Sequence, residues 1–343
     1  MIDLRSDTVT KPTPEMYQAM VSAPVGDDVF GDDPTAKKLE QCCAERLGKE
    51  AGLFVPSGTM ANLVCVLSHC RPGDEVYLTE GAHMYEFESG ALCAVGSTVP
   101  RIIKTENGAM DPDALEAAIR PASMHFARPR LLCLENTHNT AGGVAIPGDH
   151  QKKLCDIAHE HGLVVHLDGA RIWNAAIALG IDAKELARDA DSVSFCFSKG
   201  LSAPVGSIVL GSVDFIDLAR KKRKMLGGGM RQVGVLAAAA QVALDSMIDR
   251  LAEDHRRAKA LAKALEGLPG VIVLRPGIQT NMVFLDISGT GKSAAEFLSR
   301  CRERGLLVST TRRDRVRLVV NRHIDDDAVQ RAAEILREVV DSA

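Results

Sequence analysis

The order of hydrophobic and polar positions changes several times along the chain. Between residues 51 and 211, short apolar runs such as GLFV, LLCL, VVHL and SFCF alternate with stretches such as TMANLVCVLSHC, in which apolar residues recur every three or four positions. The short runs are typical of buried strands, and the longer spacing is typical of amphipathic helices. Strands that alternate with helices predict an α/β fold with a mostly parallel sheet.

The two ends of the chain depart from this pattern. Residues 1–34 are polar and contain four prolines, which predicts an extended arm with a short helix. From about residue 246, a long charged helix is followed by two strand-like runs, a helix, a strand and a final helix. We therefore expect an N-terminal arm and large domain over residues 1–245, and a smaller α+β domain over residues 246–343.

Composition excludes some classes of function. Hydrophobic residues make up 46% of the 343 positions and charged residues 25%, with a net charge of −4, as in an ordinary globular protein. We expect no general affinity for nucleic acid and no membrane span. The basic run KKRK at residues 221–224 is interpreted as a solvated or interface helix end, with a nucleic-acid or nuclear-targeting patch as the alternative.

Cysteine usage and the first residues predict the compartment. The nine cysteines form no C-x-x-C pair and their number is odd, so neither a zinc site nor a disulfide framework is expected. The segment MIDLRSDTVTK carries acids and an arginine too early for a signal peptide. We expect buried free thiols in a reducing cytoplasm, and no bound metal.

The ends of the predicted strands carry the candidate chemistry. Ligands of open α/β sheets bind beyond the carboxyl ends of the strands. The groups found there are an anion cradle, an imidazole, a carboxylate, a guanidinium and an amine, from Ser57-Gly58-Thr59, His83, Asp168, Arg171 and Lys199. We expect these groups to meet at one edge of the sheet.

Two of these features also have purely structural explanations. Ser57-Gly58-Thr59 is either a helix N-cap alone, or a helix start that presents free N–H groups to a phosphate. Asp168 ends a very apolar strand, so its buried carboxylate needs a partner. That partner is either Arg171, in a structural ion pair, or a cationic nitrogen of a ligand.

Lys199 favours the functional interpretation of both features. An amine attacks a carbonyl carbon when burial or neighbouring groups keep it unprotonated, and the end of an apolar strand provides such a setting. Pyridoxal 5′-phosphate (PLP) needs a lysine for its aldehyde, a carboxylate for its ring nitrogen and a helix N-terminus for its phosphate. The combination predicts a PLP site.

Several segments extend this prediction to a family. LRSDTVTKPTPEM, PSGTMAN, HFARPRLLCLENTHN, HLDGARIWNA, SFCFSKGLSAPVGS and RKMLGGGMRQ resemble the low-specificity L-threonine aldolases, over essentially the whole chain. The resemblance implies an aminotransferase-like, fold-type-I PLP enzyme. It implies an aldehyde-lyase that cleaves L-threonine, L-allo-threonine or both to glycine and acetaldehyde. It also implies a homo-oligomer, a tetramer with active sites shared between subunits.

The resemblance assigns roles to individual residues. Lys199 is expected to bond to the PLP aldehyde and Asp168 to the ring nitrogen, with His83 stacked on the ring. The expected phosphate ligands are Ser57, Gly58, Thr59 and, from a neighbouring subunit, Arg231. The residues expected around the substrate are Ser6, Arg171, which also borders the cofactor, Arg317 and Tyr85. Many relatives carry a tyrosine where this chain has Phe30, so a hydroxyl contact is lost there.

The group that accepts the proton of the β-hydroxyl is left open. His83 is the first candidate, because imidazole titrates near neutral pH, although it could also serve only to stack on the ring. His125, and Glu88 acting through a water molecule, are the alternatives. His138 and His166 are expected to be structural.

Other activities remain open as well. β-Elimination, transamination and racemisation use the same cofactor, and the product would distinguish them. A protein that binds PLP without catalysis is a further alternative. Such a protein would need a DNA-binding or effector module, for which the two enzyme-like domains leave no residues.

Overall fold

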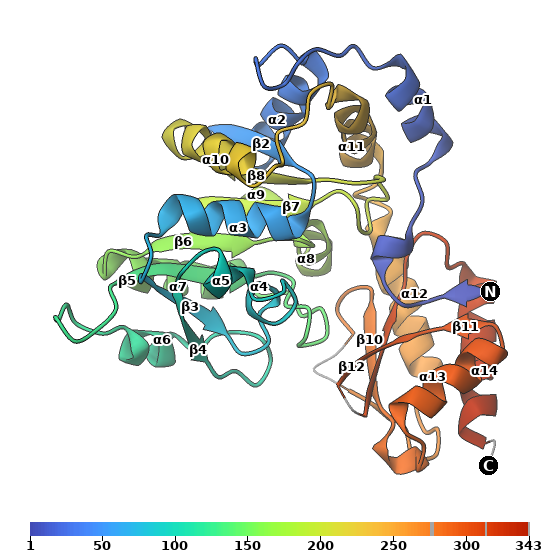
Figure 1. The fold of residues 1–343 in the computed structure, drawn as a ribbon. Coiled ribbons are helices and arrows are strands. Elements are labelled where there is room, and N and C mark those ends of the chain that lie inside the picture. The colour runs from blue at the N-terminus through green and yellow to red at the C-terminus, as the bar shows by residue number, and fades with distance from the viewer. Residues whose placement is uncertain (275–277, 313, 342–343) are drawn as a thin grey trace.

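The computed structural model describes residues 1–274, 278–312 and 314–341. Seven strands form a central sheet in the order β2-β8-β7-β6-β5-β3-β4 (Figure 1). Their bounds are Ala51–Val55 (β2), Ser207–Gly211 (β8), Ser192–Cys196 (β7), Val164–Asp168 (β6), Pro129–Glu135 (β5), Glu75–Thr79 (β3) and Val99–Ile103 (β4). All neighbours are parallel except β8, which is antiparallel to β2 and β7. The predicted α/β fold with a mostly parallel sheet is confirmed.

Helices cover both faces of this sheet (Figure 1). One layer contains α3 (Gly58–His69), α5 (Ala91–Ala94) and α10 (Val213–Met225). The other contains α2 (Pro34–Leu47), α6 (Pro112–Ala118), α7 (Gly148–Glu160), α8 (Ile172–Leu179), α9 (Ala183–Ala187) and α11 (Gly234–Ser246). Leu53 and Val55 of β2 pack into the first layer and Phe54 into the second, as the alternation of side chains along a strand requires.

Helix α2 shows how local signals set an element. Asp33 is its N-cap, and Oδ1 accepts a hydrogen bond from the backbone nitrogen of Ala36 at 2.9 Å. Pro34 occupies the first turn, where its missing N–H costs nothing. Gly48 ends the helix at a φ of 66°, in the left-handed region that glycine adopts without strain.

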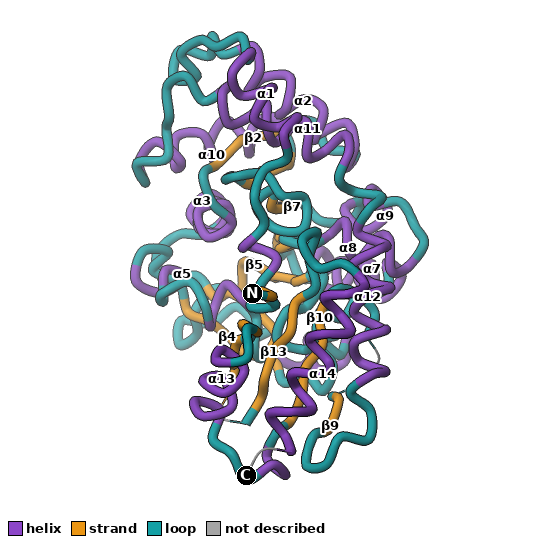
Figure 2. Tube along the Cα trace, turned by 90° about the vertical axis from the view of Figure 1, so that its right-hand side faces the viewer, coloured by secondary structure: helices purple, strands orange, loops and turns teal. Residues whose placement is uncertain are grey.

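The C-terminal part builds a second, four-stranded antiparallel sheet in the order β12-β13-β10-β9. Its strands are Ser309–Arg312, Arg315–Val319, Met282–Asp286 and Ile272–Val273, in that order. Figure 2 shows α12 (Leu251–Ala264) and α14 (Asp326–Asp341) alongside this sheet, and α13 (Ala294–Glu303) also packs on α14. The short helix η2 (Ser288–Thr290) follows β10.

The N-terminal arm connects the two parts. Strand β1 (Ile2–Asp3) pairs in parallel with β11 (Leu306–Leu307) of the C-terminal part. The short helix η1 (Asp7–Val9) follows, and α1 (Pro14–Ser22) packs on α11 of the large part.

Some elements and environments differ from the prediction. Strand β4 and helix α11 were not predicted, and of helix α10 only the basic end was. The basic run at the end of α10 is not simply solvated, because Arg223 is buried and pairs with Asp28 at 2.5 Å. Of the nine free cysteines six are buried, whereas Cys42 and Cys70 are half-buried and Cys93 is exposed. Within the described residues, no helix combines the length and apolarity of a membrane span.

Candidate active site

The carboxyl ends of six strands lie at one edge of the central sheet, and five of these strands, all except β4, lead to candidate site residues. Strands β3, β5, β6 and β7 are parallel to one another. Because β8 is antiparallel to both β7 and β2, β2 runs in the same direction as the other four. The residues that follow these strands therefore come together at this edge, as the strand-end rule predicts.

Helix α3 begins at this edge. Ser57 is its N-cap, and Oγ accepts a hydrogen bond from the backbone nitrogen of Met60 at 3.2 Å. The backbone N–H groups of Gly58 and Thr59 have no acceptor among the described residues. A Cβ atom at Gly58 would lie 2.9 Å from Sγ of Cys196, so a larger residue would displace the end of β7. The helix start thus leaves N–H groups and its positive dipole end open to an anion.

Asp168 is the last residue of β6 and is buried. Oδ2 accepts a hydrogen bond from Nδ2 of Asn62 at 2.8 Å, and Oδ1 accepts one from the backbone nitrogen of Ala170 at 3.0 Å. Burial favours the neutral acid, but the charges of His83 and Lys199 outweigh burial and lower the pKa of Asp168. The carboxylate is therefore ionised at neutral pH.

Lys199 lies in the loop that follows β7. The backbone oxygen of Lys199 accepts hydrogen bonds from Oγ1 of Thr10 and from the backbone nitrogen of Ser202, both at 2.9 Å. The first of these bonds ties the loop to the N-terminal arm. Strand β7, which leads into this loop, pairs in parallel with β6, and Asp168 lies opposite Ser194. Lys199 also lowers the pKa of both Asp168 and His83.

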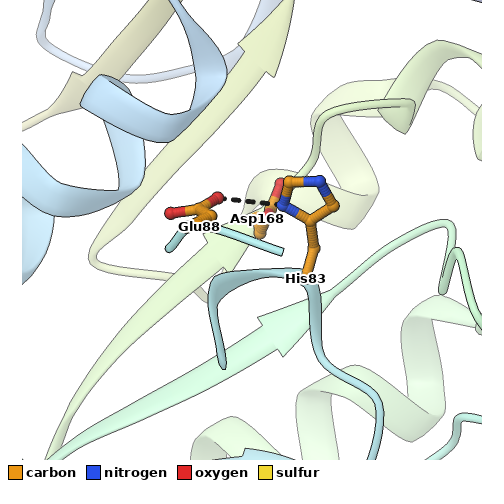
Figure 3. Close-up of side chains that lie close together, drawn as sticks. All are labelled: His83, Glu88 and Asp168. Carbon is orange, nitrogen blue, oxygen red and sulfur yellow. Dashed lines mark hydrogen bonds and ion pairs between the residues drawn. The ribbon is translucent and has the colours of Figure 1, made fainter. Parts of the chain in front are cut away.

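His83 begins α4 (His83–Glu86), and its ring points toward Glu88 with Asp168 beside it (Figure 3). Nδ1 of His83 lies 2.9 Å from Oε1 of the buried Glu88. Each of the three side chains brings a nitrogen or oxygen atom within 4.8 Å of the others. Burial alone would lower the pKa of His83, but the hydrogen bond to Glu88 and the charge of Asp168 raise it. Because Nδ1 faces Glu88, Nε2 is the nitrogen left for a substrate.

Arg171 follows β6 and is buried against the N-terminal arm. Nε and Nη2 donate hydrogen bonds to Oδ2 and Oδ1 of Asp7 at 2.8 and 2.6 Å. The structural ion pair between Arg171 and Asp168 that the sequence left open is therefore not formed. Among the described residues, Nη1 of Arg171 has no hydrogen-bond partner, so one donor group remains for an anion.

Arg317 approaches the same edge from β13 of the second sheet. Nη1 donates to Oδ1 of Asn139 at 3.2 Å, and Nη2 donates to the backbone oxygen of Arg5 at 3.3 Å. Nε is buried and has no partner in the described part of the chain. Burial, together with the charge of Arg171, lowers the pKa of Arg317. Two neighbouring guanidinium groups with unused donors can receive a carboxylate.

Ser6 and Tyr85 lie next to these groups in the chain. Ser6 is the N-cap of η1, and Oγ accepts hydrogen bonds from the backbone nitrogen and Oγ1 of Thr8 at 3.2 and 2.9 Å. Tyr85 lies on α4, two residues after His83, and is exposed. The hydroxyl of Ser6 also donates a hydrogen bond to Oδ1 of Asp7 at 3.4 Å, which links it to the ion pair of Arg171.

His125 is not brought to this edge by its own chain, and Arg231 is paired with another residue. His125 lies in the exposed loop before β5, at the amino end of that seven-residue strand, on the order of 20 Å from its carboxyl end. Nη1 of Arg231 binds Oδ2 of Asp27 at 2.8 Å, and its guanidinium lies 6.0 Å from the ring of Phe30. If His125 serves an active site, that site belongs to another copy of the chain.

Three residues of this edge were not predicted: Asp7, Asn62 and Glu135. Glu135 ends β5 and accepts hydrogen bonds from the backbone nitrogens of His83 and Asn139 at 2.7 and 2.8 Å. Its position after an apolar run is the signal that could have found it. Asn62 and Asp7 lie in a helix and in the arm, where no comparable signal exists.

The arrangement fits PLP. The start of α3 offers N–H groups to a phosphate, and Lys199 offers an amine to an aldehyde. The ionised carboxylate of Asp168 has no hydrogen bond to a cationic side chain among the described residues. It can therefore bind a protonated ring nitrogen, as the cofactor requires.

Comparisons with known proteins give the family. Residues 3–288 match the sequence family described as beta-eliminating lyase. Low-specificity L-threonine aldolase 1 of Arabidopsis thaliana is 47% identical over 328 residues, which cover 94% of this chain and 92% of that protein. The low specificity L-threonine aldolase of Escherichia coli (strain K12) is 45% identical over 326 residues, 95% of this chain and 94% of that protein. The chain belongs to the low-specificity L-threonine aldolase family.

A solved structure and the family membership confirm the predicted architecture, enzyme class and cofactor. The solved structure of Leishmania major threonine aldolase superposes with a TM-score of 0.84 at 20% identity, covering 99% of this chain and 100% of that one. The likeness confirms the aminotransferase-like, fold-type-I architecture. Membership of the threonine aldolase family confirms the recognition made from the motifs, and with it the predictions of a lyase and of PLP as cofactor.

Proposed function

We propose that the protein is a PLP-dependent aldehyde-lyase that cleaves L-threonine, L-allo-threonine or both to glycine and acetaldehyde by breaking the Cα–Cβ bond. The observation that carries this proposal is that Lys199, Asp168 and the open start of α3 all follow or end strands at the same edge of the sheet. Two arginines with unused donors lie beside these groups. The names of relatives that match over more than nine-tenths of the chain support the substrate.

Four groups would hold the cofactor. Nζ of Lys199 would bond covalently to the aldehyde, and the carboxylate of Asp168 would pair with the ring nitrogen. The N–H groups of Gly58 and Thr59 would donate hydrogen bonds to the phosphate. When bound, PLP supplies a conjugated ring that accepts the electrons of a bond broken at Cα. Asp168 keeps the ring nitrogen protonated, because a buried carboxylate stabilises a facing positive charge. The imidazole of His83 would cover one face of the ring.

The two arginines are proposed to bind the carboxylate of the substrate. A guanidinium holds a carboxylate with two parallel donors, so the carboxylate keeps one orientation. Arg171 and Arg317 would thereby select which bond at Cα is aligned for cleavage. The hydroxyl of Ser6 and the ring of Tyr85 would border the same space. Binding energy at the carboxylate is thus used for orientation.

His83 is proposed to accept the proton of the β-hydroxyl at Nε2. Its Nδ1 faces the carboxylate of Glu88, which stabilises the imidazolium that forms when Nε2 takes up a proton. Glu88 itself is buried and hydrogen-bonded to His83, so it is better placed to orient the imidazole than to reach the substrate. His125 of another copy remains the alternative base.

The assembly and compartment are part of the proposal. A homotetramer with shared active sites would bring the exposed residues His125 and Arg231 to a neighbouring site. Phe30, which is 76% exposed and contacts Arg231, lies where such a neighbour would cover it. The nine free cysteines support a reducing cytoplasm. We propose a small amino acid as the only ligand besides PLP.

The test is acetaldehyde release from L-threonine by the purified, PLP-loaded protein, coupled to NADH oxidation by alcohol dehydrogenase. L-allo-threonine and both D-isomers are run in parallel. We expect release from the L-isomers alone. The Lys199→Ala variant should release none and should hold no covalently bound PLP. A wild-type protein that holds PLP and releases no acetaldehyde would overturn the proposal.

A second activity is favoured by one observation, the match to the beta-eliminating lyase family over residues 3–288. β-Elimination from a β-hydroxy amino acid would give a keto acid and ammonia instead of an aldehyde and glycine. The same reaction mixtures can be analysed for both pairs of products. Ammonia in place of acetaldehyde would assign the elimination, and neither product would point to transamination or racemisation.

A further inference from the structure

Asn62 lies at the centre of a buried network at the candidate active site, and every hydrogen-bonding position of its amide is used. Nδ2 donates to Oε1 of Glu88 and to Oδ2 of Asp168, both at 2.8 Å. Oδ1 accepts from Oγ of Ser194 at 3.0 Å and from Nε2 of His166 at 3.2 Å. Because the side chain is buried, these hydrogen bonds form at a low dielectric constant. Each bond is therefore stronger than it would be in water, and its loss would leave a buried polar atom unpaired.

The neighbours fix the orientation of this amide. If its oxygen and nitrogen were exchanged, the oxygen would face two carboxylates. Burial lowers the pKa of His166 to about 4, so its ring is neutral and carries one proton. Nδ1 of His166 lies 3.0 Å from Oγ of Ser192, whose hydroxyl can donate to it. The proton of His166 is then on Nε2 and directed at Oδ1 of Asn62.

The two carboxylates that share the amide nitrogen have different roles in the proposed function. Asp168 faces the ring nitrogen of PLP, whereas Glu88 orients His83. Two buried carboxylates at close range disfavour each other's charge. Burial and the charge of Asp168 both raise the pKa of Glu88, and the hydrogen bond from Asn62 acts in the opposite direction. The same amide helps to lower the pKa of Asp168.

We propose that Asn62 is a positioning residue that holds Glu88 and Asp168 as paired acceptors, and so fixes His83 and the ring nitrogen of PLP together. This proposal rests on the proposed use of the site for PLP. Asn62 acts only through the two carboxylates. Its loss should therefore weaken PLP binding and the chemical step, and should leave recognition of the substrate carboxylate almost unchanged.

The first test compares Asn62→Leu with the wild-type protein in PLP affinity, kcat, KM and melting temperature. Leucine keeps a similar volume and removes both N–H donors. We expect PLP to bind about tenfold more weakly and kcat to fall about tenfold, because a hydrogen bond to a charged group is lost on each side. KM for L-threonine should stay within about threefold, since the arginines that bind the carboxylate are not touched.

The control for lost stability is Asn321→Leu. Asn321 lies in the C-terminal part and is also buried. Its Nδ2 donates to the backbone oxygen of Asp3 in the N-terminal arm, and none of its hydrogen bonds involves Glu88 or Asp168. This variant should lose stability and keep its PLP affinity within about twofold. If Asn62→Leu also keeps its PLP affinity and kcat within that range while its melting temperature falls, Asn62 is only structural and the proposal is overturned.

Asn62→Asp adds a readout that a purely structural role would not move. The introduced carboxyl group would stand among Glu88, Asp168, His83 and His166, with Lys199 near Asp168. At pH 8 it would be ionised and repel both carboxylates, whereas a protonated carboxyl group supplies one O–H donor in place of an N–H. PLP affinity relative to wild type should therefore recover as the pH falls toward about 6. If the ratio of the PLP affinity of Asn62→Asp to that of the wild type does not change with pH, the proposal is contradicted.

The two proposals fail in different ways. If the wild-type protein binds PLP and cleaves no L-threonine, the proposed substrate is wrong, while the PLP affinities of the Asn62 variants still judge the role of the amide. If Asn62→Leu does not fold, the nearly isosteric Asn62→Asp carries the test alone, through the pH dependence of its PLP affinity.

Discussion

Asp7 and Arg171 form a buried, bidentate ion pair between the N-terminal arm and the edge of the central sheet. Both hydrogen bonds are short, at 2.8 and 2.6 Å, and both side chains are buried. Asp7 also accepts a hydrogen bond from Nδ2 of Asn281 at 3.4 Å. Asn281 directly precedes strand β10 of the second sheet. One carboxylate thus holds together the arm, the large part and the C-terminal part of the molecule.

We predict that Asp7→Asn lowers both stability and activity. Removing one partner of a buried pair leaves an uncompensated charge on Arg171, which costs about 3–5 kcal/mol of unfolding free energy. The guanidinium also loses its fixed orientation, so kcat/KM for L-threonine should fall at least about tenfold. Urea unfolding and steady-state kinetics measure the two effects.

The control for Asp7→Asn is Asp245→Asn, which removes an exposed ion pair with Arg46 at 2.8 Å, the length of the longer Asp7–Arg171 bond. Its unfolding free energy should change by less than about 1 kcal/mol, because solvent screens such pairs. Equal effects of the two substitutions would show that Asp7 does not act through burial and orientation of Arg171.

The same ion pair predicts how stability depends on pH. Burial alone would raise the pKa of Asp7, but the charge and hydrogen bonds of Arg171 lower it to about 2. Since the folded pKa lies below the unfolded one, the pair stabilises the protein fully above about pH 4, and this contribution is lost as the pH falls toward about 2. The difference in unfolding free energy between wild type and Asp7→Asn should shrink over that range. A difference that stays constant would contradict this assignment.

The strand ends could be predicted from the sequence, whereas the residues that position them could not. An apolar run followed by Asp168 or Lys199 is a local pattern, and parallel topology then brings the ends together. The bonds from Arg171 to Asp7 and from Asn62 to Asp168 span 164 and 106 residues. Such contacts depend on tertiary packing, which leaves no periodic signal in either partner.

A third prediction concerns the pH dependence of the proposed base. Glu88 raises the pKa of His83 through a hydrogen bond and through its charge, against the opposing effect of burial. If neutral His83 is the base, activity rises with pH through that raised pKa. Glu88→Gln removes the charge and should move the rising limb of kcat/KM to lower pH. Steady-state rates from pH 5 to pH 9 measure the shift.

The control for this experiment is Glu86→Gln, an exposed carboxylate on the same short helix as His83. Water screens the charge of Glu86 from His83, so the rising limb of kcat/KM in Glu86→Gln should stay at the wild-type pH. If Glu88→Gln also leaves the limb unchanged, the titrating group in the profile is not His83. A base supplied by another copy of the chain would then be favoured.

The position of His125 leads to a prediction about shared sites. Within one chain it lies at the amino end of β5, away from Lys199. If it serves the site of a neighbour, His125→Ala and Lys199→Ala should each be nearly inactive alone but complement each other when co-expressed. Random pairing makes about half of the dimers mixed, and each mixed dimer has one complete site of two, so activity should return to about a quarter of the wild-type value.

The control for complementation combines two defects of the same site, Lys199→Ala and Asp168→Ala. Each mixed dimer then has one site without the lysine and one without the carboxylate, so no complete site can form and activity should stay near zero. Because both pairs are co-expressed and purified in the same way, the comparison separates sharing of a site from simple stabilisation by a partner. An active control pair, or an active His125→Ala protein on its own, would show that His125 is not supplied across the interface.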